Sequence, residues 1–262
     1  MKTGTLYLIP SNLSDAFEPA QILPATVIAT ALRLNHYVAE NAKTARAFLK
    51  KLGIGRPLLE LSIVELNNQT HANTLREMIA PLLAGHDVGL VSEAGAPGVA
   101  DPGALVVAMA HQQGIPVVPL VGPSSILLGL MASGLNGQKF AFHGYLPQDK
   151  SARRAMIVAL EKESRDRNMT QLFIETPYRN QALSADLFAT LASSTHLCLA
   201  RDLSGQHEYV RTMCIGDWRK HAIAIEKLPT LFLFLAESAR AQRQSRPRAA
   251  AINCQVVEAA RK

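Results

Sequence analysis

Three loops rich in glycine, proline and serine carry the residues with which this sequence could do chemistry. The longest lies within LVSEAGAPGVADPG, Leu90 to Gly103, where glycine lets a ligand approach the main chain and Glu93 can accept hydrogen bonds from an amine or hydroxyl group. A second, within VVPLVGPSSILLG, places Ser124 and Ser125 at the start of a predicted helix, whose first N–H groups are free to bind a ligand. The third is IPSNL, near the N-terminus. Three such loops at one sheet edge favour a small-molecule site.

Each loop follows a predicted strand and precedes a predicted helix. Apolar runs at residues 5–9, 87–91 and 115–121 predict buried strands, and amphipathic patterns between and after them predict helices. Asp101 is expected to cap one of these helices, with Pro102 at its first position. The alternation predicts an α/β fold, with a mainly parallel sheet that has helices on both faces. Neither GxGxxG nor GxxxxGK[ST] occurs, so a dinucleotide fingerprint or a P-loop is not supported.

The pattern of predicted helices and strands changes after residue 137. A charged helix is predicted at about 150–165, followed by the strand-like runs QLFIE, HLCLA, YVRTMCI and TLFLFLAE. We therefore predict an N-terminal α/β domain at 1–137, a C-terminal α/β domain at 138–238 and a basic extension at 239–262.

The composition narrows the class of protein. The chain is 48% hydrophobic and 18% charged, and it has no apolar run long enough for a membrane span. Three cysteines without metal-ligand spacing indicate reduced thiols in a cytoplasmic protein, and no metal site is expected. The net charge of +6 is concentrated in the extension, where six cationic side chains and one acidic side chain give +5. That extension is either a solvated tail or an arm that contacts phosphates.

Several motifs resemble, in content and in order, those of methyltransferases with the tetrapyrrole methylase fold. These motifs are GTLYLIP, LVSEAGAPGVADPG, VPLVGPSS, ETPYR, ARDLS and PTLFLFLAE. The most similar branch is that of the bacterial ribosomal RNA small subunit methyltransferase I proteins, which 2′-O-methylate a cytidine. The resemblance implies two α/β domains, the second with a mixed sheet, and a homodimer. It also implies that S-adenosylmethionine binds in the cleft between the domains.

By position, the resemblance implies which residues would contact the cofactor. They are Pro10, Glu93, Ala96, Ser124 and Ser125 in the first domain, and Ile174, Ala200, Pro229 and Thr230 in the second. The chain departs from the branch in several places. PSNL replaces a longer Pro-Thr-Pro-Ile-Gly-Asn-Leu loop, Glu93 stands for Asp, Tyr178 for His, and Asn41 for an acid. The resemblance therefore supports the predicted fold and cofactor more strongly than it supports ribosomal RNA as the substrate.

A sugar hydroxyl is a weak nucleophile, so methyl transfer to it would benefit from a nearby base. Glu40 and Lys43 in ENAKTAR and Glu175 in ETPYR are the candidates. The alternative is a structural role for these carboxylates. Glu40 would then form a surface ion pair with Arg46, and Glu175 would stabilise a turn by pairing with Arg179.

Cationic side chains are the candidates for contacts with an RNA substrate. Arg46, Arg179 and Arg201 are the predicted substrate-binding residues, although Arg201 would equally hold Asp202. The cluster of Lys150, Arg153 and Arg154 is either a solvated helix face or an RNA contact.

The leading hypothesis is a methyltransferase that uses S-adenosylmethionine and acts on RNA. Two alternatives remain. One is a methylase of a tetrapyrrole or another small molecule on the same fold. The other is a catalytically idle RNA-binding or assembly protein.

Overall fold

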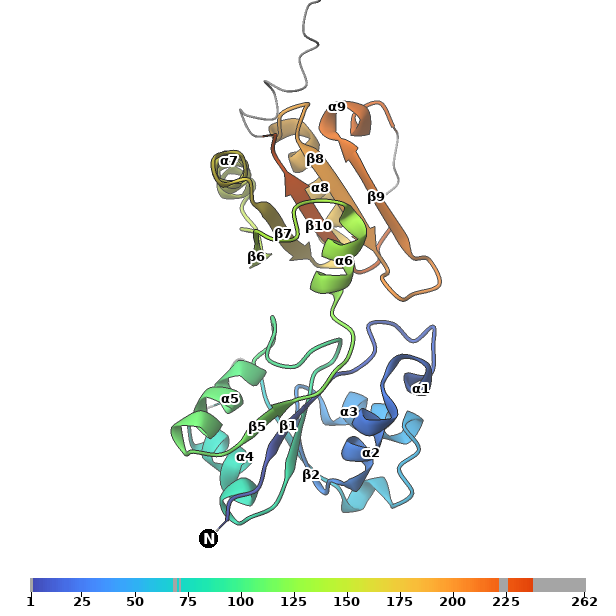
Figure 1. Ribbon diagram of the computed structural model, residues 1–262, viewed down its shortest axis with the longest axis vertical. Helices are drawn as coiled ribbons and strands as arrows, with labels where there is room; N and C mark the ends of the chain where they lie inside the picture. The colour runs from blue at the N-terminus through green and yellow to red at the C-terminus, as the bar shows by residue number, and fades with distance from the viewer. Residues whose placement is uncertain (1, 68–69, 71, 222–225, 238–262) are drawn as a thin grey trace, which may run out of the picture.

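The computed structural model describes residues 2–67, 70, 72–221 and 226–237. The predicted basic extension and Cys254 lie outside these residues. Figure 1 shows two α/β bodies, one around each of two five-stranded sheets. This confirms the predicted fold class. In the described part of the chain, no helix has the length and apolar character needed to cross a membrane.

The first sheet is entirely parallel. Its strands are β1 (Leu6–Ile9), β2 (His36–Ala39), β3 (Ser62–Glu65), β4 (Val88–Val91) and β5 (Val117–Pro119), in the order β3-β2-β4-β1-β5. All their carboxyl ends therefore lie at the same edge of the sheet. This is the edge at which open α/β sheets bind ligands.

Helices cover both faces of the first sheet. One apolar cluster joins the sheet to α2 (Ala25–Arg33) and α3 (Ala42–Lys51), and a second joins the opposite face to α4 (Ala72–Leu83) and α5 (Gly103–Gln112). Strands β1 and β2 thus lead to helices on one face, while β3 and β4 lead to helices on the other. The neighbours β1 and β4 therefore send their loops to opposite faces, which is the point in an open α/β sheet where ligands bind. Two short elements, α1 (Pro19–Ile22) and the 3-10 helix η1 (Leu58–Glu60), complete this domain.

The second sheet is mixed, as predicted. Its strands are β6 (Phe140–Tyr145), β7 (Thr170–Glu175), β8 (His196–Arg201), β9 (Tyr209–Cys214) and β10 (Thr230–Leu235). The order is β6-β7-β10-β8-β9, and only the β6–β7 pair is parallel.

Helices pack on both faces of this sheet as well. α7 (Lys150–Arg167), α8 (Asn180–Thr190) and α9 (Ile215–Trp218) cover the aromatic core of one face, and α6 (Ser125–Ser133) packs on the other. The 3-10 helix η2 (Pro177–Arg179) precedes α8. The predicted boundary at residue 137 places α6 in the first domain. However, a Cβ added to Gly129 of α6 would lie 2.4 Å from Leu231 Cδ2, so the helix sits directly against β10. A boundary drawn by packing falls before α6 (Figure 1).

The structure corrects the interpretation of Arg153 in the basic cluster on α7. Arg153 is buried, and its Nε donates to Asp186 Oδ2 at 2.9 Å while its Nη1 donates to the carbonyl oxygen of Gln148 at 2.8 Å. Arg154 Nε donates to the other carboxylate oxygen of Asp186 at 2.7 Å. These two guanidinium groups join α7 to α8, so Arg153 belongs to the interior, whereas Lys150 is exposed and the Arg154 side chain is 43% exposed.

Candidate active site

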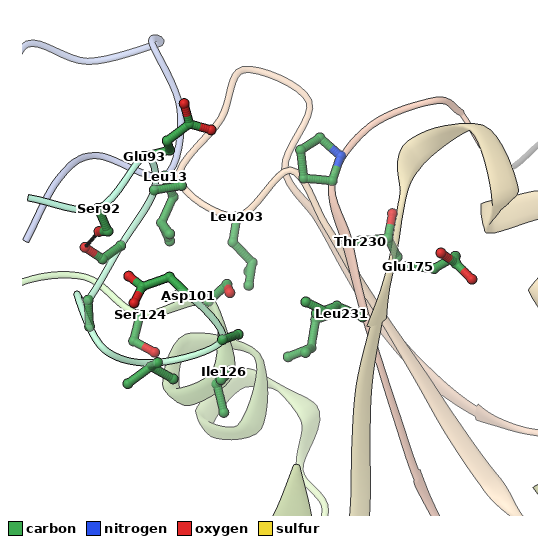
Figure 2. Close-up of a pocket in the computed structure, with 18 of the residues that line it drawn as sticks. Leu13, Ser92, Glu93, Asp101, Ser124, Ile126, Glu175, Leu203, Thr230 and Leu231 are labelled. Atoms are coloured by element: carbon green, nitrogen blue, oxygen red, sulfur yellow. Dashed lines mark hydrogen bonds between the residues drawn. The ribbon is translucent and has the colours of Figure 1, made fainter. Parts of the chain in front are cut away.

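A cavity of about 380 Å³ lies between the two domains. Figure 2 shows Ser92, Glu93 and Ser124 of the first domain's loops on one side, and Thr230 and Leu231 of the second sheet on the other. The volume is at the lower end of the range for small-molecule sites. A ligand here would contact both domains.

The cavity brings together most of the residues that the resemblance assigned to the cofactor. Eight of the nine line it, namely Glu93, Ala96, Ser124, Ser125, Ile174, Ala200, Pro229 and Thr230. Pro10 is not part of the lining. It packs beneath the turn before α6, where a Cβ on Gly122 would lie 2.2 Å from Pro10 Cγ. The candidate bases Glu40 and Glu175 also line the cavity, whereas Lys43, Arg46, Arg179 and Arg201 do not.

The loop after β4 needs its glycines for its backbone conformation. Gly95 and Gly98 have φ angles of +76° and +80°, in the left-handed region that favours glycine. A Cβ at Gly95 would also lie 3.0 Å from Leu13 Cδ2. The shortened loop after β1 therefore packs against this turn, and Leu13 reaches the cavity.

Asp101 fixes the end of the same loop. Its Oδ1 accepts the backbone N–H groups of Gly98 and Gly103, each at 2.8 Å. The helix α5 begins at Gly103, one residue later than predicted, so Pro102 is the residue before the helix and not its first residue. Asp101 still caps the helix through the Gly103 N–H. Its carboxylate also lines the cavity, a role that the sequence analysis did not assign.

Burial raises the pKa of two carboxylates at the cavity. For Glu40, burial is the largest cause and the charge of Asp101 adds to it, while the backbone N–H of Glu93 partly offsets them. For Asp101, burial outweighs the hydrogen bonds from Gly103 and Gly98. A carboxylate with a raised pKa is a stronger base than an ordinary one, which suits Glu40 to accept a proton from a hydroxyl group.

Glu175 is held in an ion pair at the end of β7. Arg179 Nη2 lies 2.6 Å from Glu175 Oε1, and the Thr176 N–H donates to the same oxygen at 2.7 Å. The pair closes the turn into η2, as the structural alternative expected. Since three donors, Arg179 Nε included, converge on Oε1, this oxygen is poorly placed to accept a further proton.

The two remaining candidate arginines lie away from the cavity lining. Arg201 Nη1 pairs with Glu226 Oε1 at 3.2 Å, and its guanidinium lies 5.2 Å from the centre of the Tyr209 ring. Asp202, the alternative partner, instead accepts the His207 N–H at 2.8 Å. Arg46 is half-buried on α3, and its Nε has no hydrogen-bond partner.

Sequence reasoning missed a set of apolar and loop residues that complete the cavity. These are Leu13, Ile126, Phe142, Tyr145, Leu203 and Leu231. Leu13, Leu203 and Leu231 stand in the motifs IPSNL, ARDLS and PTLFLFLAE, but only tertiary packing shows that their side chains line the cavity. Among the described residues, no group of histidine, cysteine and carboxylate side chains is arranged to hold a metal ion.

Comparison with known proteins identifies relatives that match about four fifths of this chain. No protein-family model matches it. Ribosomal RNA small subunit methyltransferase I of Escherichia coli O157:H7 is 33% identical over 218 residues, which cover 82% of this chain and 70% of the relative. The protein of the same name from Xylella fastidiosa is 35% identical over 211 residues, covering 79% of this chain and 71% of the relative.

A solved structure shows the same fold. The methyltransferase CobJ superimposes with a TM-score of 0.58 over 90% of this chain and 95% of its own, at 15% identity. At that identity the likeness is one of architecture, which agrees with the two-domain arrangement of Figure 1.

Proposed function

Since this chain belongs to the ribosomal RNA small subunit methyltransferase I family, we propose that it methylates ribosomal RNA with S-adenosylmethionine as the methyl donor. The acceptor that the resemblance implies is the 2′-hydroxyl of a cytidine. The observation that carries the proposal is the convergence of eight expected cofactor residues, from both domains, on one cavity.

The lining residues have chemistry that suits a cationic donor. Glu93 and Asp101 supply negative charge for a sulfonium and an ammonium group, while Ile174, Ala200 and Pro229 supply an apolar surface for a nucleobase. Ser124 precedes α6 and makes no side-chain capping bond, so its hydroxyl and the first N–H groups of the helix remain for a ligand. S-adenosylmethionine, when bound, supplies an activated methyl group.

The transfer is an in-line displacement that needs no metal. The donor would supply the methyl group, so that the acceptor oxygen would bond to the methyl carbon as the carbon–sulfur bond broke, with S-adenosylhomocysteine as the leaving group. Glu40 accepts the hydroxyl proton in this proposal, since burial raises its pKa and its carboxylate borders the cavity. Glu175 holds the turn that carries Thr176 and Pro177, rather than acting as the base.

A direct test compares three outcomes. The protein is incubated with labelled S-adenosylmethionine and with small ribosomal subunits from cells that lack it, or with a uroporphyrinogen-type substrate. Label on ribosomal RNA supports the proposal, and label on the macrocycle supports a tetrapyrrole methylase. If calorimetry detects no binding at millimolar S-adenosylmethionine, the protein is an idle RNA-binding or assembly protein.

The basic extension provides a separate test of RNA contact. If four of its arginines contact single-stranded phosphates, the slope of log affinity against log salt concentration should include about −3 from them. Removal of residues 239–262 should then weaken RNA binding and flatten the slope. An unchanged affinity and slope would exclude the extension as an RNA-binding arm.

We also propose that the protein works in the cytoplasm.

In addition, we propose that two copies of the chain associate through β5 and α6. The sequence has no charged residue from 112 to 138, yet Val121, Leu127 and Met131 in this stretch are 75%, 54% and 77% exposed. Apolar, uncharged surface of this kind is typical of the core of a homodimer interface. Sedimentation of a Val121→Lys, Met131→Lys double variant should show a monomer where the wild-type protein is a dimer. Equal masses for the two proteins would exclude this interface.

A further inference from the structure

A second cavity, of about 300 Å³, borders the first at the carboxyl edge of the parallel sheet. The segment that follows β1 and the helix α3 line it, together with the ends of β2 and β4. Glu40 and Glu93 line both cavities, as do Leu13, Ser92 and Ala94. The candidate base therefore lies in the wall between the two spaces.

We propose that the second cavity binds the acceptor nucleotide as a single nucleoside turned out of its RNA strand. This inference rests on the proposed function, because it assigns the methyl donor to the first cavity. An acceptor must place its nucleophile about 3–3.5 Å from the methyl carbon, so donor and acceptor sites have to share a wall. A sugar hydroxyl at this wall would meet Glu40, which the transfer needs as a base.

The lining of the second cavity suits one nucleoside. Asn12, Asn41 and Thr44 offer polar groups, and Phe48 with Ala39 offers apolar surface. Asn12 Nδ2 donates to the carbonyl oxygen of Phe17 at 2.9 Å, while its Oδ1 is buried without a hydrogen-bond partner. Enzymes that modify one nucleotide commonly turn it into a pocket of this kind, at the cost of its stacking energy.

The charge of α3 points to a polyanionic strand as the source of that nucleoside. The helix carries Lys43, Arg46, Lys50 and Lys51 and has no acidic residue. Lys51 Nζ lies 2.5 Å from Asp15 Oδ1, which connects the helix to the segment after β1. The other three cations remain along the helix for phosphates on either side of the turned-out nucleotide. Lys43 and Arg46, both candidates from the sequence, lie on this helix but are not among the residues that line the cavity.

The test fills the second cavity and leaves the first intact. Ala47→Trp and Thr44→Trp place a large ring on α3 at the cavity lining, and Ala80→Trp places the same ring on an exposed position of α4 as a control. For each variant, calorimetry measures binding of S-adenosylmethionine, and a labelled-methyl assay uses small ribosomal subunits from cells that lack the protein.

We expect both filling variants to bind S-adenosylmethionine as the wild-type protein does and to lose methyl transfer by at least ~10²-fold, because misplacing a reacting group by about 1 Å already costs this much. The control should retain both properties. If Ala47→Trp and Thr44→Trp transfer methyl groups at the wild-type rate, the second cavity does not bind the acceptor, while the proposed function is unaffected. If the wild-type protein itself neither binds S-adenosylmethionine nor transfers methyl groups, the proposed function fails first.

Discussion

Ser11 and Gly95 form an antiparallel bridge that ties the loop after β1 to the loop after β4. The Ser11 N–H donates to the Gly95 carbonyl oxygen at 3.0 Å, and the Gly95 N–H donates back at 3.2 Å. Ser92 Oγ reinforces the contact by donating to the same Gly95 oxygen at 2.8 Å. The bridge shapes the first-domain side of the cavity, even though the loop after β1 is shortened.

Gly95→Val should therefore weaken cofactor binding. Valine at a φ of +76° is strained, and its Cβ would lie 3.0 Å from Leu13 Cδ2, so the loop must shift. We expect at least a ~10-fold loss of affinity for S-adenosylmethionine, which corresponds to about 1.4 kcal/mol. Calorimetry measures it. Gly55→Val is the control, since no atom lies within 4 Å of its added Cβ. Equal affinities for the two variants would show that the bridge does not shape the binding site.

Glu40→Gln should retain cofactor binding and lose most of its methyl transfer, because the amide cannot accept the hydroxyl proton. General-base contributions are typically 10²–10⁴-fold. The wild-type rate should fall as the pH is lowered through the raised pKa of Glu40, and the variant should lack this acidic limb. A variant with the wild-type rate and pH profile would remove Glu40 from the mechanism.

The same substitution has an expected effect on stability. Because the pKa of Glu40 is higher in the folded than in the unfolded protein, the folded state binds more protons between the two values. The free energy of unfolding therefore declines as the pH rises through this window, and the ionised carboxylate is a cost at neutral pH. Glu40→Gln should remove that cost, so denaturant unfolding at pH 7 should show a variant at least as stable as the wild type. A clearly less stable variant would contradict the raised pKa.

Asp186→Asn should destabilise the second domain without changing the cofactor site. The carboxylate is buried, which opposes ionisation, but hydrogen bonds from Arg154 and Arg153 outweigh burial and lower its pKa. Removing one partner of a buried ion pair typically costs 3–5 kcal/mol, and we expect about that loss in denaturant unfolding at pH 7. Since the folded pKa is lowered, this contribution should fade as the pH falls through the window between the unfolded and folded values.

Two observations would contradict this account of Asp186. One is a variant as stable as the wild type, which would mean that the ion pair contributes nothing. The other is a stability difference that persists unchanged at acid pH. A folded variant that no longer binds S-adenosylmethionine would mean that Asp186 contributes to the cofactor site, although it does not line the interdomain cavity.

Lys43→Gln with Arg46→Gln should weaken RNA binding in a salt-dependent way. Each lost contact with a single-stranded phosphate reduces the slope of log affinity against log salt by about 0.7, so the double variant should flatten it by about 1.4. Lys162→Gln with Arg167→Gln is a control of equal charge change on α7, where both residues pair with acidic neighbours. Filter binding at several salt concentrations measures both. Equal slopes for the two double variants would exclude α3 as an RNA contact.

Local patterns were enough to predict the first sheet, because apolar runs that alternate with amphipathic segments indicate a parallel sheet. The four later strand-like runs predict further strands, but only the family resemblance implied that their sheet is mixed. The glycine loops marked the cavity for a physical reason, because Gly95 and Gly98 adopt left-handed backbone conformations at the end of β4.

Contacts between residues that are far apart in the sequence could not be predicted from local patterns. Arg153 looked like one cation in a basic run, but Asp186, 33 residues later in the chain, pairs with it in the interior. The position of α6 on the second sheet depends on the fit of Gly129 against Leu231, which no local pattern reveals. Likewise, the apolar residues that complete the cavity converge on it from separate elements.

The central claim is that the interdomain cavity binds S-adenosylmethionine for transfer to ribosomal RNA. Ala200→Trp would fill this cavity from β8, so transfer of labelled methyl groups to small ribosomal subunits lacking the modification tests the claim most directly. We predict incorporation into ribosomal RNA by the wild-type protein and none by the folded variant. Equal incorporation by both proteins, or none by either, would contradict the claim.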